Sequence, residues 1–128
     1  MTRGQTRRPV RVLIADDHRL FAEALEAVLS TEEQIEVVGR AADGGEAVEL
    51  ARELEPDVVA LDISMPVLDG FEAADRMKSL ERPPAILMLT GSNAPEDVER
   101  ARRAGVQGYI TKDAISASLV DAIIAAGR

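Results

Sequence analysis

The 128-residue chain contains no cysteine and no tryptophan, and these absences exclude several kinds of site. Without cysteine, neither disulfide bonds nor thiolate metal sites can form. No apolar run approaches the roughly 20 residues that a helix needs to span a bilayer, so we expect no contact with a membrane. Two phenylalanines and one tyrosine leave an aliphatic core and no aromatic platform for single-stranded nucleic acid.

Positive charge is also scarce, because 15 lysines and arginines stand against 23 aspartates and glutamates, for a net charge of −8. An acidic domain of this kind is not expected to contact nucleic acid itself. The exception is the segment 1–9, which holds three arginines and no apolar run typical of a secretory signal. We expect residues 1–9 to be a disordered basic leader and the protein to be cytoplasmic.

Short apolar runs alternate with helical patterns along the rest of the chain. We expect strands at 10–15, 35–42, 57–62, 83–90 and 107–111, each followed by a helix. Five such units predict an α/β fold: a single (βα)5 doubly wound domain over residues 10–128, with a five-stranded parallel sheet. The first, third and fourth strands are almost wholly apolar, which is typical of central strands buried on both faces.

Capping signals delimit the helices. Asp43 and Asp69 each precede a glutamate by three residues, which is the spacing of a capping box, and the second of these helices is expected to end near residue 80. Gly105 is expected to end the fourth helix and Ser116 to cap the fifth. In the first helix, the spacing predicts a buried stripe of Leu20, Phe21, Ala24, Leu25, Val28 and Leu29.

Polar residues follow four of the expected strands: Asp16 and Asp17 after the first, Asp62 at the third, Thr90 at the fourth and Lys112 after the fifth. Residues at the carboxyl ends of parallel strands converge on one crevice. Clustered carboxylates repel one another and attract a hard divalent cation such as Mg²⁺. A hydroxyl and an ammonium beside them suit a transient anion. The pattern indicates magnesium-dependent phosphoryl chemistry on a carboxylate.

Each of these residues also has a simpler interpretation. Asp16 and Asp17 could be an acidic helix start, Thr90 a turn residue and Lys112 a solvated strand end. An aspartate at the end of an apolar strand, such as Asp62, is harder to explain without a ligand. His18 is interpreted as loop structure, because Mg²⁺ disfavours imidazole.

Four motifs in this order carry a resemblance to a known family. They are ADDH at 15–18, LDISMPVLDG at 61–70, LTGS at 89–92 and GYITKD at 108–113. The chain resembles, over residues 10–127, the receiver domain of two-component response regulators, and in particular the NarL/LuxR-type subgroup. The resemblance implies a flavodoxin-like strand order of 2-1-3-4-5. One departure is Asp113, which stands where many receivers have proline.

The resemblance also implies roles for individual residues. Asp62 would be the phosphoacceptor, with a sensor histidine kinase as the donor. The groups implied to hold Mg²⁺ are Asp16, Asp17, Asp62 and the backbone carbonyl of Ser64. Those implied to bind the phosphoryl group or to act as the switch are Thr90, Lys112 and Tyr109.

The same resemblance implies a signalling switch rather than an enzyme with its own substrate. Transcription would be controlled through a C-terminal DNA-binding domain that this chain lacks. Phosphorylation is expected to favour a homodimer through the fourth helix, fifth strand and fifth helix, where Val106 and Tyr109 are expected to be exposed.

Three alternatives remain open from the residues alone. A phosphatase of the haloacid-dehalogenase type also uses an aspartate nucleophile, but usually has a second aspartate at the position of Ser64. A flavodoxin-like FMN binder would need a first loop that does not repel phosphate. A scaffold receiver that is not phosphorylated would be expected to lack some of the signature residues.

Overall fold

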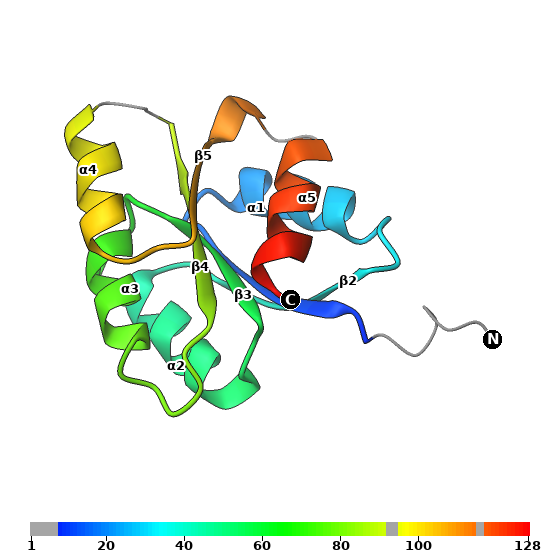
Figure 1. Cartoon of the computed structure of the whole chain (residues 1–128), viewed down its shortest axis with the longest axis horizontal. Helices are drawn as coiled ribbons and strands as arrows, with labels where there is room; N and C mark the ends of the chain where they lie inside the picture. The colour runs from blue at the N-terminus through cyan, green and yellow to red at the C-terminus, as the bar shows by residue number, and fades with distance from the viewer. Residues whose placement is uncertain (1–7, 92–94, 115–116) are drawn as a thin grey trace.

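The computed structural model of the protein describes residues 8–91, 95–114 and 117–128 (Figure 1). Within them, five parallel strands form one sheet in the order β2-β1-β3-β4-β5. The strands are β1 (Val10–Ala15), β2 (Ile35–Ala41), β3 (Val58–Asp62), β4 (Ala85–Thr90) and β5 (Gly108–Thr111). The helices are α1 (Arg19–Leu29), α2 (Gly44–Leu54), α3 (Gly70–Met77), α4 (Pro95–Arg103) and α5 (Ala117–Ala126). The expected fold class and strand order are confirmed.

Helices cover both faces of the sheet (Figure 1). Alternate residues of β1 explain this arrangement, because successive side chains of a strand point to opposite faces. Leu13 joins a core formed with α2, α3 and α4, whereas Val12 and Ile14 join a second core formed with α1 and α5. Every residue of β3 is buried, as the apolar sequence predicts for a central strand. No helix in the described part of the chain has the length and apolar character of a membrane-spanning segment.

The capping residues act largely as expected. Asp69 and Glu72 form a complete capping box, in which each side chain accepts a hydrogen bond from the other's backbone N–H. Asp43 also caps its helix. Gly105 follows α4 with a φ of 76°, a left-handed conformation that glycine adopts at little cost. The helix α3 ends at Met77, slightly earlier than expected. Ser116 lies outside the described residues.

The expected buried stripe of α1 is partly wrong. Leu20 is 81% exposed and Val28 is 43% exposed, and Ala24 is exposed as well. The buried residues of α1 are Ala22, Leu25 and Leu29. Alanines occur on several sides of this helix, so the hydrophobic period alone does not distinguish the expected stripe, which contains Ala24, from the neighbouring stripe that contains Ala22. The packing of α1 against the sheet selects the stripe that contains Ala22.

Candidate functional site

The strand register brings the predicted polar residues to one edge of the sheet, here called the carboxyl edge. Asp62 lies opposite Leu89, so Thr90 follows on the neighbouring strand, and Thr90 lies opposite Thr111, the residue before Lys112. Asp16 continues β1, and its backbone N–H donates to the carbonyl of Ala41 at 3.0 Å. The structure therefore brings together residues that are up to 96 positions apart in the chain.

Three carboxylates, those of Asp16, Asp17 and Asp62, form an acidic cluster at this edge. Together with His18, they place candidate ligand atoms within 4.8 Å of one another. Asp16 and Asp62 are both buried, at 3% exposure each, whereas Asp17 is exposed. One oxygen of Asp16, Oδ1, accepts a hydrogen bond from the backbone N–H of His18 at 2.8 Å. This hydrogen bond between residues two positions apart fixes the orientation of the buried Asp16 carboxylate.

Each of the two buried carboxylates has an Oδ2 atom without a hydrogen bond among the described residues, but that of Asp16 lies 2.7 Å from Lys112 Nζ, so Asp62 is the less satisfied of the two. Its Oδ2 atom is buried and has no hydrogen-bond partner among the described residues. The pKa of Asp62 is raised to about 6, mainly by burial and in addition by the neighbouring Asp16 carboxylate, whereas Lys112 opposes the rise. A buried acceptor without a partner costs free energy, so this oxygen is available to an incoming cation or electrophile.

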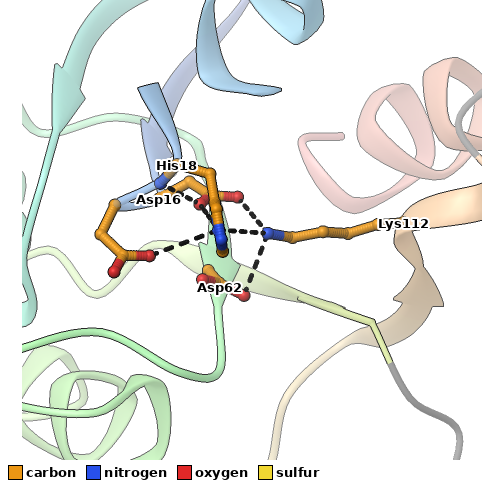
Figure 2. A network of polar contacts seen from close by, with 5 residues as sticks. Asp16, His18, Asp62 and Lys112 are labelled. Atoms are coloured by element: carbon orange, nitrogen blue, oxygen red, sulfur yellow. Dashed lines mark hydrogen bonds and ion pairs between the residues drawn. The ribbon is translucent and has the colours of Figure 1, made fainter. Parts of the chain in front are cut away.

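Lys112 is the cation that faces the acidic cluster (Figure 2). Its Nζ atom lies 2.7 Å from Asp16 Oδ2 and 3.5 Å from Asp62 Oδ1. It begins a 3₁₀-helix over Lys112–Ala114 that directly follows β5, and its side chain is 18% exposed. One ammonium against three carboxylates leaves the site with an excess of negative charge, which favours binding of a divalent cation.

The imidazole of His18 lies beside the acidic cluster, which its interpretation as loop structure did not predict. Its Nδ1 atom is 3.4 Å from Asp16 Oδ1, 3.5 Å from Asp17 Oδ1 and 3.5 Å from Lys112 Nζ (Figure 2). The side chain is 70% exposed and makes no capping hydrogen bond to α1. The carboxylate oxygens remain the donors that suit Mg²⁺, because that ion prefers oxygen ligands.

The donor set fits a magnesium ion on structural grounds. The cluster offers hard oxygen donors, and the buried Oδ2 of Asp62 lacks any other described partner. Mg²⁺ keeps several waters, so a few carboxylates at a crevice that opens to solvent are sufficient. Ser64, the residue whose backbone carbonyl was predicted to take part, is exposed in the loop after β3.

The β3–α3 loop is tightly fixed behind Asp62. The backbone N–H of Gly70 donates to the carbonyl of Ile63 at 2.6 Å, and a Cβ atom on Gly70 would lie 2.3 Å from the carbonyl oxygen of Asp62. Further along, Leu68 N–H donates to the carbonyl of Pro66 across Val67, whose φ is 72°. This is a γ-turn in its rare, strained form. Any side chain at residue 70 would displace Asp62.

The predicted switch residues lie at this edge or close to it. Thr90 is buried, at 5% exposure, and Gly91 after it has no described atom within 4 Å of the place that a Cβ would occupy. Tyr109 lies in β5 opposite Met88. Tyr109 and Val106 were expected to be exposed, but both are half-buried, because they pack against the core beneath α2, α3 and α4.

One contact of the site was not predicted from the sequence. The Phe21 ring lies beneath Lys112, with Nζ 4.5 Å from the ring centroid. The helical pattern correctly indicated that Phe21 turns inward, but no local signal links it to a lysine 91 residues away. Only the packing of α1 beside the end of β5 brings the two together.

Comparison with known proteins agrees with the resemblance that the sequence motifs indicated. A family model described as the response regulator receiver domain matches residues 12–124. The "Probable transcriptional regulatory protein NarL" of Mycobacterium tuberculosis is 38% identical over 115 residues, which cover 90% of this chain and 53% of that protein. The response regulator protein VraR of Staphylococcus aureus is 39% identical over 114 residues, which cover 89% of this chain and 54% of that protein.

This chain therefore spans about half the length of these curated relatives. A solved structure covers the matching half. The signal receiver domain of NarL from Mycobacterium tuberculosis superposes with a TM-score of 0.90 at 36% identity, covering 94% of this chain and 98% of that one.

Proposed function

The chain belongs to the family of response regulator receiver domains, and on this premise we propose that it is a phosphorylation-activated switch whose phosphoacceptor is Asp62. The phosphoryl donor is a sensor histidine kinase. The observation that carries the proposal is the state of Asp62: a buried carboxylate with one oxygen that lacks a described partner, beside the ammonium of Lys112.

The reaction proposed is nucleophilic attack by an Asp62 oxygen on the phosphorus of the donor. The new O–P bond forms as the bond from phosphorus to the donor breaks, and the donor leaves with that electron pair. Because the pKa of Asp62 is about 6, the carboxylate is mostly ionised at neutral pH and can act as the nucleophile. Lys112 then neutralises the phosphoryl oxygens.

We assign the magnesium site to Asp16, Asp17 and Asp62 with the backbone carbonyl of Ser64. When bound, Mg²⁺ would screen the negative charge of both the cluster and the phosphoryl group. Asp16 has a second task, because it also holds Lys112 through Oδ2. Losing Asp16 would therefore affect the orientation of Lys112 as well as the metal.

The output follows from the charge added at Asp62. An acyl phosphate carries about −1.5 to −2 charges where the ionised carboxylate carried −1, and the Thr90 hydroxyl can approach its oxygens as a hydrogen-bond donor. Tyr109 would then turn inward and change the surface formed by α4, β5 and α5. We propose that this change favours a homodimer and controls transcription through a DNA-binding domain outside this chain. The domain formed by residues 10–128 would act in the cytoplasm.

Intact-protein mass spectrometry tests the proposal. With acetyl phosphate and Mg²⁺, the wild-type protein should gain one phosphoryl group, and removal of Mg²⁺ should prevent this. Asp62→Asn should abolish the adduct. Asp57→Asn is a matched control, because Asp57 is half-buried and lies just before the first residue of β3, at the end of the strand away from Asp62. An adduct that persists in Asp62→Asn, or that never forms in wild type, would contradict the assignment.

A further inference from the structure

We propose that Phe21 is a positioning residue for the phosphoryl-transfer site: its ring holds the ammonium of Lys112 in place against the acidic cluster. This inference rests on the proposed function of Asp62. Its geometric basis is the 4.5 Å distance from Lys112 Nζ to the centre of the Phe21 ring. A lysine ammonium within about 6 Å of an aromatic face is attracted by the ring quadrupole.

Phe21 is fixed by its own surroundings. It lies in the first turn of α1, is half-buried, and packs against the core shared by α1 and α5. The ring therefore forms a rigid support on one element for a side chain that comes from another. A surface hollow of about 550 Å³ opens beside the pair, and Phe21 and Lys112 both line it.

Lys112 needs such a support because of what it contacts. Its Nζ lies against Asp16 and Asp62 in the resting protein and must turn toward a phosphoryl oxygen when Asp62 is modified. A lysine stem is long and flexible, so an unsupported ammonium has many other conformations to occupy. Fixing it beforehand lowers the ordering cost of the reaction.

An aromatic ring suits this task better than another carboxylate would. A carboxylate would compete with the phosphoryl group for the N–H donors of Lys112. The face of Phe21 attracts the ammonium without offering a full negative charge. The N–H groups therefore remain available to the phosphoryl oxygens while the methylene stem stays on the ring.

The sequence provides a direct structural test, because the chain contains only two lysines, Lys78 and Lys112. In protein labelled with ¹³C-lysine, the Cε methylene protons of Lys112 should be shifted upfield by the Phe21 ring current, and Lys78→Arg assigns the two signals. Phe21→Leu should remove the shift and Phe21→Tyr should keep it. A Lys112 signal that is the same in wild type and Phe21→Leu would overturn the proposal.

The functional test is the rate of phosphorylation by acetyl phosphate. Phe21→Leu, which keeps the apolar bulk but loses the ring, should lower the rate constant about tenfold, and Phe21→Tyr should restore it to within about threefold of wild type. Phe71→Leu is the matched control, because Phe71 lies under Arg100 instead of Lys112. It should keep a rate close to that of wild type.

Two results would reject the role of Phe21 in the reaction. One is an equal loss of rate in Phe71→Leu, because the loss of any aromatic ring from the core would then explain the slower phosphorylation. The other is a full Phe21→Leu effect in a Lys112→Met background, since Phe21 would then not act through Lys112. If the wild-type protein itself takes no phosphoryl group, the proposed function fails, and the ring-current measurement still decides whether Phe21 positions Lys112.

Discussion

At the scale of single residues, the buried carboxylate of Asp62 lowers the stability of the folded protein when it is ionised. Burial makes the ionised form of its carboxylate costly, so its pKa rises from 3.8 to about 6. Below the lower value the carboxyl group is neutral in both the folded and the unfolded state. Between the two values only the unfolded state loses its proton, so stability falls as the pH rises through this window.

Asp62→Asn should therefore stabilise the metal-free domain at neutral pH and leave its stability nearly unchanged near pH 3.8. The expected gain at neutral pH is up to about 2–3 kcal/mol, because each unit of pKa shift corresponds to about 1.4 kcal/mol. Urea denaturation in EDTA at a series of pH values measures the difference. A difference between variant and wild type that does not depend on pH would show that the Asp62 pKa is not raised.

Val67 is a second residue at which the fold is strained. It is β-branched, has a φ of 72° and is 77% exposed, so little packing compensates for its left-handed conformation. Val67→Asn should raise the free energy of unfolding by about 1 kcal/mol, because asparagine tolerates this conformation far better. Val28→Asn, at an exposed valine inside α1, should not stabilise the protein. Thermal melting of both variants tests this prediction. A lower melting temperature for Val67→Asn than for wild type would show that the backbone at Val67 is not strained.

At the scale of elements, one arginine links two helices near the site. Arg100 in α4 lies over the Phe71 ring of α3, 4.2 Å from its centroid, and 3.8 Å from Asp69 Oδ2 at the start of α3. Arg102, two residues further along α4, pairs only with Glu99 of its own helix among the contacts described. The start of α3 is in turn tied to the residue after Asp62, because the backbone N–H of Gly70 donates to the carbonyl of Ile63.

Arg100→Ala should lower the free energy of unfolding by about 1 kcal/mol, mostly through the lost cation–π contact. Arg102→Ala removes the same charge from the same helix but no contact between helices, and it should cost clearly less stability than Arg100→Ala. Urea denaturation measures both. Equal losses would mean that the contact across the helices contributes nothing beyond its charge.

The helices and strands also show which features of the fold could be predicted from the sequence alone. Strands such as β3 were predictable because a short, unbroken apolar run between turn signals is typical of a buried strand. The polar residues at strand ends were predictable because a parallel sheet gathers them at one edge. The buried side of α1 was not, since alanines blur its hydrophobic face, and neither was the support of Lys112 by Phe21, which depends on the angle at which α1 packs.

At the scale of the whole molecule, repulsion within the acidic cluster should make stability depend on Mg²⁺. Binding to the folded state alone stabilises it by about 2.7 kcal/mol at a concentration 100 times the Kd. The melting temperature should therefore rise with millimolar Mg²⁺. Asp17→Asn should weaken this response, whereas Asp75→Asn, an exposed change on α3, should leave it intact. An equal response in all three proteins would place the metal elsewhere.

The open space beside Gly91 bears on the duration of the signal. An acyl phosphate on Asp62 persists only until a water molecule reaches its phosphorus atom, and access decides how soon that happens. Gly91, next to Thr90, has no side chain, and no described atom lies within 4 Å of the place that a Cβ would occupy. We therefore expect a bulkier residue at position 91 to slow this hydrolysis, so that the response would retain more memory of an earlier stimulus.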